Sequence, residues 1–250
     1  MKKRYNGNFS YLCDIGKVRK TNEDEIKGLK NPGGDILLAV CDGIGGVKNG
    51  GYASKICLST LIQDFSNKYK FLTVFDAYIW LLKEGKKINK LIFDYQALNP
   101  EYHGIGTTLC VVIIIKNKFV LMNVGDSRCY INSNNGLKQI SEDHTYVNYL
   151  LNSGLITKEE ALTHPKRHYL TNCVGMNPSF SCDIKIFDYK GESILLCSDG
   201  LYNNVSFNDI EANLNTKFSL NEKVNSLVNL ANFNGGSDNI SVLIWETYND

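Results

Sequence analysis

The sequence predicts an α+β fold in which helices lie outside layers of antiparallel sheet. Short runs rich in Val, Ile and Leu alternate with tight turns through the middle of the chain, a pattern typical of strands joined by hairpins. Helical patterns stand in pairs on either side of that middle. Because an amphipathic helix must bury its apolar face, helices that flank a sheet-rich centre are expected to pack on the outside of the sheets.

Eight strands are expected from runs of aliphatic and β-branched residues. They are Ile36 to Cys41, Thr108 to Ile115, Phe119 to Val124, Ser127 to Ile131, Leu137 to Ile140, Cys182 to Phe187, Ser193 to Ser198 and Ile240 to Trp245. Three tight turns follow strands: "KNK" at Lys116, "NNG" at Asn134 and "YKG" at Tyr189. These turns indicate hairpins, so we expect the sheets to be largely antiparallel.

The first pair of helical patterns lies between Tyr52 and Leu98, and its second member starts at the capping candidate Thr73, with Asp76 three residues on. The apolar positions of this second helix are Val74, Ile79, Leu82, Leu91 and Tyr95. Near the end of the chain, Ser206 and Ser219 repeat the start signal, which predicts two further helices.

The composition is that of an ordinary globular protein. Of 250 residues, 43% are hydrophobic and 21% are charged, which is too apolar for a disordered chain. The most apolar run, Leu109 to Ile115, is far shorter than the roughly 20 residues of a membrane span. The basic start leads into polar residues, unlike a signal peptide. A net charge of +1 creates no field that would recruit nucleic acid or an anionic membrane.

The eight cysteines form no CxxC pair and stand mostly inside apolar strands, which favours a reducing cytoplasm. The segment Thr145 to Thr171 has a weak strand signal and a charged centre, and we expect a helical excursion that acts as a mobile flap. No low-complexity linker divides the chain. We therefore expect residues 1–250 to form one domain.

Acidic residues stand where strands meet loops. "LLAVCDG" and "ILLCSDG" each end an apolar strand on Asp-Gly, at Asp42 and Asp199, while Asp126 follows a third strand and Asp238 precedes a fourth. Any one Asp-Gly could simply form a turn. Hairpin-linked strands can bring four such acids to one rim, where their charges would repel unless a cation neutralised them. Hard divalent cations such as Mg²⁺ or Mn²⁺ prefer such oxygen ligands.

The glycines beside the first acid fit this interpretation. Gly43 has no Cβ, so its carbonyl group can approach a metal ion, and Gly45 and Gly46 allow a sharp turn beside it. Upstream, Arg19 offers a planar fork for two phosphate oxygens, and Glu23 could hold metal-bound water. The alternative for Arg19 is an ordinary surface ion pair with Glu23.

Two other arrangements of reactive residues are weaker. Cys13 and Arg19 have the Cys-x5-Arg spacing of cysteine-dependent phosphatases, but the acids that follow would raise the pKa of the thiol. His164 and His168 have a metal-ligand spacing, but Pro165 argues against one continuous helix through both. The histidines are expected in loops, with His144 supporting the edge of the site.

Seven motifs run in order from about Gly16 to Val242: "GKVRKTNED", "AVCDGIGG", "GTTL", "NVGDSR", "SEDHT", "LLCSDGL" and "GGSDNISV". Together they resemble the motifs of the metal-dependent protein phosphatases, the type 2C serine/threonine family, in its compact bacterial form. The resemblance covers nearly the whole chain. It implies a four-layer α/β/β/α sandwich, with two central antiparallel sheets between outer helices and a binuclear Mn²⁺ or Mg²⁺ centre at one end.

The resemblance also implies a role for each site residue. Asp42 would bridge both metal ions, the Gly43 carbonyl would bind one of them, Asp199 and Asp238 would bind the other, and Asp126 would help to hold a third. The implied reaction is hydrolysis of phosphoserine and phosphothreonine on proteins by a metal-activated water, without a phosphoenzyme.

The remaining roles concern phosphate and the surroundings of the metals. Arg19 matches the phosphate-binding arginine, and Glu23 with Asp24 match an acidic pair near the metals and their waters. Asn239 and His144 are expected to support the site. The family resemblance further implies phosphoprotein substrates, an opposing serine/threonine kinase and a monomeric state.

The chain departs from the family pattern in two places. Ile44 stands where animal relatives have a histidine that is proposed to protonate the leaving group, and an aliphatic side chain cannot donate a proton. His168 stands where relatives often have asparagine, which affects the flap. Two other functions stay open: a catalytically silent relative that binds phosphoproteins, and a two-metal hydrolase of small phosphoesters.

Overall fold

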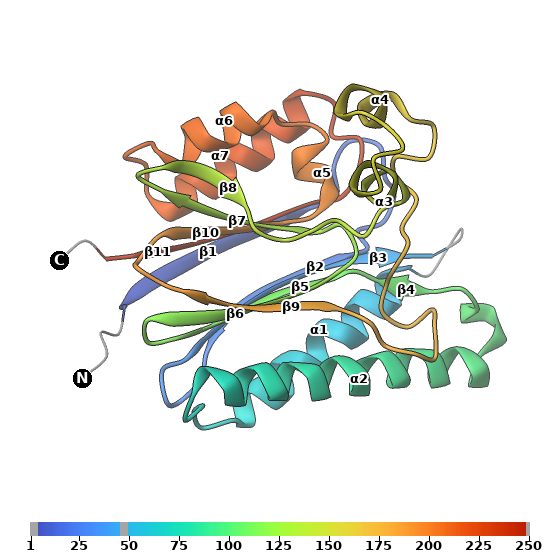
Figure 1. Ribbon diagram of the computed structural model, residues 1–250, viewed down its shortest axis with the longest axis horizontal. Helices are drawn as coiled ribbons and strands as arrows, with labels where there is room; N and C mark the ends of the chain where they lie inside the picture. Colours follow the sequence, from blue (N-terminus) through green and yellow to red (C-terminus); the bar gives the residue numbers. More distant parts are fainter. Residues whose placement is uncertain (1–4, 46–49, 249–250) are drawn as a thin grey trace.

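The computed structural model describes residues 5–45 and 50–248, so the turn glycine Gly46 lies outside the described residues. Two antiparallel sheets stack face to face, and helices cover the outer face of each (Figure 1). The predicted α+β class and the four-layer α/β/β/α arrangement are both confirmed. Within the described residues, no helix has both the length and the apolar character needed to cross a membrane.

The first sheet has five strands and contains both ends of the described chain. Its strands, in spatial order, are β1 (Gly7–Asp14), β11 (Ile240–Thr247), β10 (Ser193–Cys197), β7 (Arg128–Ser133) and β8 (Gly136–Gln139). β1 and β11 pair along their whole length, so that Gly7 lies opposite Thr247 and Asp14 lies opposite Ile240.

The second sheet holds the most deeply buried strands. Its order is β2 (Asp24–Lys30), β3 (Ile36–Ile44), β5 (Leu109–Ile115), β6 (Lys118–Val124) and β9 (Asp183–Asp188), and the two-residue strand β4 (Gly106–Thr107) pairs with the end of β3. All seven residues of β5 are buried, because this strand has sheet on one face and helices on the other.

All eight predicted strands are present, with shifts of a few residues at their ends. Three strands were not predicted, namely β1, β2 and β4. β1 and β2 are edge strands with mixed polar and apolar residues, and β4 is too short to show a pattern. The hairpin predicted for "YKG" at Tyr189 is wrong, because β9 belongs to the second sheet and β10 to the first. That turn carries the chain between the sheets.

Two helices cover the second sheet and three cover the first. α1 (Gly50–Asn67) and α2 (Val74–Leu98) lie on the second sheet, followed by a short 3-10 turn, Pro100–Tyr102, while α5 (Asp199–Tyr202), α6 (Phe207–Leu214) and α7 (Leu220–Phe233) lie on the first. The predicted start signals are confirmed: Thr73 forms a capping box with Asp76, Ser206 caps α6, and Ser219 caps α7.

The core-facing side of α2 differs from the apolar positions picked out in the sequence. Its fully buried stripe runs through Ala77, Leu81, Ile88 and Ile92, whereas Leu91 is 44% exposed. These buried positions recur at helical spacing, but small or polar residues interrupt them, including a glycine that packs against Phe180. The sequence pattern was therefore dominated by large side chains that lie beside the buried stripe.

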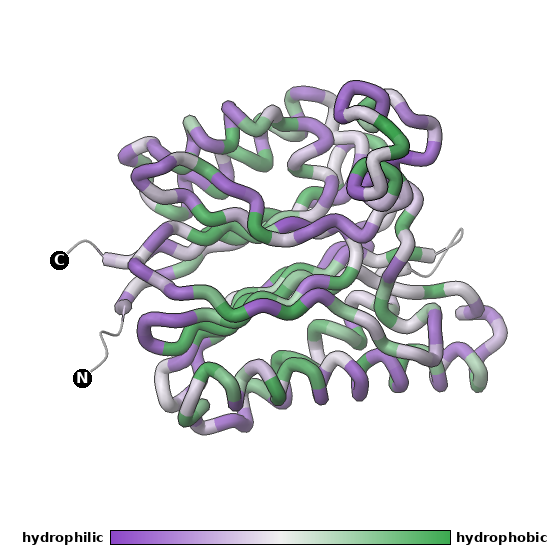
Figure 2. The backbone as a smooth tube through the Cα atoms, in the orientation of Figure 1, coloured by the Kyte–Doolittle hydropathy of each residue, from purple (hydrophilic) through white to green (hydrophobic). Residues whose placement is uncertain are grey.

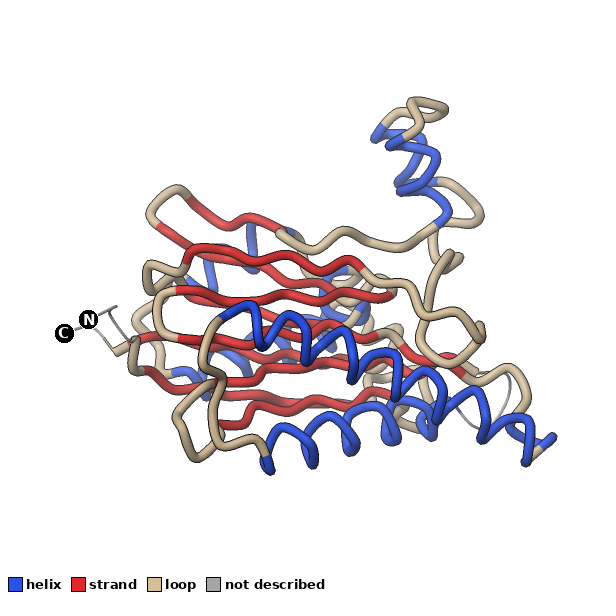
Figure 3. Tube along the Cα trace, turned by 60° about the horizontal axis from the view of Figure 1, so that its bottom comes forward, coloured by secondary structure: helices blue, strands red, loops and turns tan. Residues whose placement is uncertain are grey.

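The expected flap is helical. α3 (Tyr146–Asn152) and α4 (Lys158–Thr163) follow the first sheet and project from the body of the sandwich (Figure 3). Neither helix contains a buried residue. The segment returns at Leu170, whose backbone forms a bridge with that of Thr145. It therefore stands beside one end of the two sheets.

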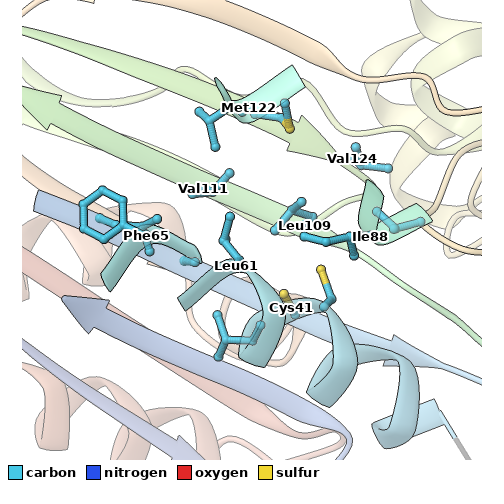
Figure 4. Close-up of a cluster of buried hydrophobic side chains, with 14 of the residues drawn as sticks. Cys41, Leu61, Phe65, Ile88, Leu109, Val111, Met122 and Val124 are labelled. Atoms are coloured by element: carbon cyan, nitrogen blue, oxygen red, sulfur yellow. The ribbon is translucent and has the colours of Figure 1, made fainter. Parts of the chain in front are cut away.

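Three apolar clusters separate the four layers. One lies between α1, α2 and the second sheet, one lies between the two sheets, and one lies between the first sheet and α5 to α7. Hydrophobic residues follow the inner strands in Figure 2. Figure 4 shows the first cluster, in which Leu61, Phe65 and Ile88 of the helices face Val111 and Met122 of the strands. Burial of these side chains holds the strand ends in fixed positions.

A partly buried acid between α1 and α2 generates a pH prediction. Burial, reinforced by the neighbouring Asp64, raises the pKa of Glu84 to about 7. Its Oε2 has no hydrogen-bond partner among the described residues, and Lys87 Nζ lies 3.7 Å from it. When folding raises the pKa of a carboxyl group, the folded protein loses stability as pH rises from the unfolded pKa of that group through its folded pKa. Glu84→Gln keeps the neutral form at every pH. We expect it to raise the free energy of unfolding by about 1 to 2 kcal/mol at pH 8 and to have little effect near pH 4.5.

Urea unfolding at both pH values measures this difference. Gln at Glu101, an exposed acid in the 3-10 turn after α2, serves as a control for removal of an acidic side chain from this layer. An equal effect of Glu84→Gln at both pH values would show that the side chain does not titrate in this range.

Candidate metal centre

A cavity of about 880 Å³ is lined by residues at the end of β3, just after β6 and β10, and in the segment that returns from the flap. The end of β3 lies at the opposite end of the sandwich from the two described ends of the chain (Figure 1). All four of the predicted strand-end acids line the cavity, together with the predicted arginine: Asp42, Asp126, Asp199, Asp238 and Arg19. These residues come from both sheets. The stacking of the sheets therefore brings together acids that are up to 196 positions apart in the chain, between Asp42 and Asp238.

The backbone of Asp42 is held by two threonines of the "GTTL" motif. The amide of Asp42 donates to Thr108 Oγ1 at 2.8 Å, and its carbonyl accepts from the Thr108 amide at 2.9 Å and from Thr107 Oγ1 at 2.9 Å. The hydroxyl groups of Thr108 and Ser127 lie 2.7 Å apart, which links this contact to the first sheet. The position of Asp42 is therefore fixed by hydrogen bonds on both sides of its peptide unit.

Gly43 lies where two backbones pass very close to each other. A Cβ on Gly43 would stand 2.5 Å from the carbonyl oxygen of Gly50 and 2.6 Å from that of Glu23, so a larger residue cannot fit without a shift. The Gly43 amide donates to the Glu23 carbonyl at 3.1 Å. The Glu23 carboxylate accepts from the amide of Gly50, the first residue of α1, at 3.1 Å. The helix N-terminus thus orients this acid beside the cavity.

Asp199 is the first residue of α5 and not a simple strand end. Its Oδ2 accepts from the side chain of Asn203 at 3.1 Å. Gly200 allows α5 to pack against the segment before β11, since a Cβ there would lie 2.0 Å from the Asn239 carbonyl oxygen. This close approach places Asp199 next to Asp238.

Arg19 pairs with Asp238 and not with Glu23. Its guanidinium group lies 2.6 Å from Asp238 Oδ2, and the Arg19 side chain is 54% exposed. The hydrogen bond to Asp238 raises the pKa of Arg19, and the charges of Asp199 and Asp42 raise it further. The predicted alternative of an Arg19–Glu23 ion pair is therefore wrong, and the cation faces the acidic cavity.

Asp24 is buried beside Asp42, its partner in the β2–β3 register. Ser198 donates to Asp24 Oδ2 at 2.6 Å, whereas Asp24 Oδ1 is buried and has no hydrogen-bond partner within residues 5–45 and 50–248. Burial raises the pKa of Asp24 to about 6, and the charge of Asp238 adds to this shift. A buried, unpaired carboxylate oxygen is costly unless a proton or a cation satisfies it.

The other acids of the cavity are also shifted upward. Burial raises the pKa of Asp42 well above its ordinary value, and the charges of Asp24, Asp199 and Asp126 raise it further. Burial and the charges of Asp126 and Asp238 do the same for Asp199. Burial, with the nearby Asp143, raises the pKa of Asp126 to about 6. Each carboxylate thus opposes the ionisation of the next, and the cavity favours added positive charge.

This donor set fits hard divalent cations in its chemistry. It offers carboxylate oxygens and a backbone carbonyl, in an environment whose negative charge is poorly compensated. Within residues 5–45 and 50–248, no group of three His, Cys, Asp or Glu side chains is already arranged closely enough to hold an ion. The carboxylate of Asp238 is turned to Arg19 instead.

Of the two residues expected to support the site, Asn239 lines the main cavity and His144 does not. Asn239 is buried and ties three loop residues together: it accepts from the Glu23 amide at 2.9 Å and donates to the carbonyls of Ile15 at 2.9 Å and Thr21 at 3.0 Å. His144 does not line the main cavity but an adjoining groove. Its Nδ1 accepts from the Gly125 amide at 3.2 Å.

The remaining sequence candidates are separated by the fold. His168 lines the cavity, but His164 does not and ends α4, as the sequence argument against a shared metal site predicted. Cys13 lies in β1 and hydrogen-bonds to Asn22 and Ser241, each at 3.1 Å. Burial raises the pKa of Cys13 to about 11, so its thiol is protonated at neutral pH.

Several cavity residues had no role assigned from the sequence, among them Thr108, Arg167 and Met176. Thr108 belongs to a recognised motif, but its hydrogen bonds to Asp42 cannot be read from the motif alone. Arg167 lies in the flap segment, where no periodic pattern identifies it, and Met176 follows a turn at Gly175. The places of Arg167 and Met176 in the cavity depend on the return path of residues 164–182.

Comparison with known proteins identifies the class of this fold and site. The family model described as protein phosphatase 2C matches residues 17–233. The serine/threonine phosphatase stp of Listeria welshimeri is 37% identical over 237 residues, which cover 94% of each chain. The protein phosphatase PhpP of Streptococcus pneumoniae is 32% identical, over 94% of this chain and 95% of the relative.

Solved structures agree with these relatives. The serine/threonine phosphatase Stp1 of Staphylococcus aureus superposes with a TM-score of 0.93 at 33% identity, covering 100% of this chain and 98% of the other. The catalytic domain of the serine threonine protein phosphatase PstP, solved in complex with two manganese ions, superposes with a TM-score of 0.84 at 28% identity, covering 97% and 99%. The chain belongs to the protein phosphatase 2C family and is a protein phosphatase.

The hydrogen bond from Asp42 to Thr108 generates a test of how the site is positioned. Thr108→Val keeps the size of the side chain but leaves the buried Asp42 amide without an acceptor, which costs about 1 to 3 kcal/mol in the free energy of unfolding. We expect kcat to fall at least about 10-fold as Asp42 loses its fixed position. Thr108→Ser keeps the hydroxyl group and is the matched control. Equal kcat values for the two variants would show that this hydrogen bond does not position the site.

Proposed function

We propose that this chain hydrolyses phosphoserine and phosphothreonine esters of proteins at the cavity described above. The observation that supports this function is the convergence of four strand-end carboxylates with Arg19 in one cavity at the end of the sandwich. The similar proteins named above are serine/threonine phosphatases, and one similar structure holds two manganese ions. We propose residues 1–250 as a single catalytic domain.

The proposed ligands are those that the family resemblance implies, and each of them lines the cavity. Asp42 and the Gly43 carbonyl would hold one ion, and Asp42, Asp199 and Asp238 the other. Bound there, two Mn²⁺ or Mg²⁺ ions would lower the pKa of a water molecule and neutralise phosphate oxygens. Asp126, which lies on the flap side of the cavity, would help to hold a third ion.

The chain's own residues would bind and orient the phosphate. Arg19 is exposed at the cavity and retains donors beyond its bond to Asp238, so its guanidinium group can hold phosphate oxygens. Glu23 and Asp24 would accept hydrogen bonds from water near the ions, and Asn239 keeps Glu23 in place. Ile44 lines the cavity and donates no proton, so the leaving alkoxide would take its proton from water.

The proposal also covers the partners, the cellular location and the oligomeric state of the enzyme. We propose that it opposes a serine/threonine protein kinase in the cytoplasm, acts in signalling as a monomer, and binds neither nucleic acid nor membranes. The balanced net charge of +1 supports the last two points. A catalytically silent scaffold is disfavoured, because it would not need to bury acids at the cost shown by their raised pKa values.

Removal of single carboxylates tests the metal centre. We expect Asp42→Asn and Asp199→Asn each to reduce manganese-dependent hydrolysis of an aryl phosphate at least about 100-fold, because each removes a ligand charge. Calorimetric titration with Mn²⁺ should show weaker binding in both variants. Asp94→Asn on the exposed outer face of α2 is the control. Full activity of the Asp42 and Asp199 variants, or activity without divalent cations, would contradict the proposal.

Substrate comparison separates the protein phosphatase from the alternatives. We expect phosphothreonine and phosphoserine peptides to be hydrolysed at least about 10-fold faster, by kcat/KM, than a phosphotyrosine peptide or sugar phosphates. Equal rates on all of these would favour a general phosphoesterase. Cys13→Ser should keep full activity, because the buried thiol lies outside the cavity. Inactivity of that variant, with the fold retained, would revive the cysteine mechanism.

A further inference from the structure

A second depression continues from the cavity along the chain segment that leads from the flap to β9. This groove has a volume of about 580 Å³. It shares three lining residues with the cavity, namely Leu170, Cys173 and Met176. A polypeptide with its phosphorylated residue in the cavity therefore has a continuous path into the groove.

The groove is preformed, because its floor is fixed to two different elements. Val174 and Thr107 of β4 exchange backbone hydrogen bonds of 2.8 and 3.0 Å. Asn89 of α2 accepts from the Gly175 amide and donates to the Asn177 carbonyl, each at 2.8 Å. A peptide would bind without first ordering this segment, which lowers the entropic cost of binding.

The character of the wall changes along the groove. Leu170 and Met176 lie where it joins the cavity, and Met176 is 48% exposed, so this part is apolar and adaptable. Farther from the cavity the wall is polar, with Asn172, Asn177, Ser179 and Ser181.

Asp183, at the start of β9, ends the groove. Its side chain is 43% exposed, and His144 Nε2 lies 3.4 Å from its Oδ2. Among the described residues that line the groove there is no Lys or Arg, and Asp183 is the single acid. A Lys or Arg side chain in the groove would therefore meet a carboxylate whose partner from the described wall is His144.

The other side of the cavity carries charges of both signs. There the cavity adjoins a depression of about 430 Å³ beneath α3 and α4, and the two share Asp126 and Arg167. Its second arginine, Arg128, is bonded to Asp143 at 2.6 Å and stacks on Tyr202. A basic side chain on this side would meet both Arg167 and Asp126, whereas the groove offers Asp183 without a Lys or Arg beside it in the wall.

We propose that the groove binds the substrate residues on one side of the phosphorylated residue and selects a Lys or Arg there through Asp183. This inference rests on the proposed function, since it places a phosphopeptide in the cavity. An apolar residue next to the phosphoresidue packs on Leu170 and Met176, and the basic residue lies a few positions farther along. The substrate class is therefore phosphoproteins with a basic residue near the phosphorylated one.

Phosphothreonine peptides that carry Lys, Gln or Glu two, three or four positions before or after the phosphoresidue test this inference. We expect Lys to raise kcat/KM about two- to five-fold over Gln, through a lower KM, on one side only. Glu should lower it on the same side. The preference should weaken as salt rises, since the ion pair is partly exposed.

Substitutions of Asp183 test whether this acid causes the preference for Lys. Asp183→Asn should remove the difference between Lys and Gln peptides, and Asp183→Lys should favour the Glu peptide. Asp188→Asn, near the other end of β9, is the matched control and should keep the Lys preference. An aryl phosphate, too small to reach the groove, is measured in parallel. An equal loss of activity on this compound would show that Asp183 acts through the catalytic centre, and would overturn the proposal.

The outcomes separate the two proposals. Hydrolysis of all peptides at equal kcat/KM, or a Lys preference that survives in both Asp183 variants, would overturn the groove assignment and leave the protein phosphatase intact. Absence of metal-dependent hydrolysis of every phosphopeptide would instead contradict the proposed function. The peptide series on the unmodified chain decides the preference even if a variant fails to fold.

Discussion

Repulsion among carboxylates at one end of the sandwich is the constraint on which the rest of the structure depends. Burial and the charges of Asp24, Asp199 and Asp126 raise the pKa of Asp42, and Asp24 lies buried beside it with an oxygen atom that has no hydrogen-bond partner among the described residues. Such an arrangement opposes folding, so the surrounding layers must hold it together. The same unfavourable charge gives the cavity its affinity for positive partners, among which Arg19 is already in place.

The scaffold positions Asp42 through its backbone. Thr107 and Thr108 bind the peptide groups on either side of Asp42, and Asn239 ties the loop of Glu23 to the segment before β11. The carboxylates of Asp199 and Asp238 are instead held by Asn203 and Arg19. The apolar layers on both sides of the second sheet make this framework rigid, because a strand such as β5 cannot shift without disturbing two cores.

Much of the fold could be predicted from the sequence because burial leaves a strong pattern. Central strands such as β5 are continuous apolar runs, and Thr73 marks the start of α2 by a capping box. Edge strands β1 and β2 mix polar and apolar residues and show no such pattern. The turn at Tyr189 has the residues of a hairpin, but tertiary packing sends the following strand to the other sheet.

The acids that line the cavity could be predicted from the sequence, but the contacts that they make could not. Strand-end acids are visible in the sequence, but the choice of Asp238 over Glu23 as the partner of Arg19 depends on how two distant loops meet. The groove ending at Asp183 has no sequence signal, since its wall is an irregular segment held by single hydrogen bonds such as those of Asn89.

The pairing of β1 with β11 determines where a tether to another protein or to a surface could be attached. The Tyr248 amide donates to the Asn6 carbonyl at 2.9 Å, so the two described ends of the chain leave the sandwich side by side. They do so at the far end from the cavity (Figure 1). A tether attached at either end would therefore lie far from the cavity. It would not block the access of large phosphorylated targets to the cavity.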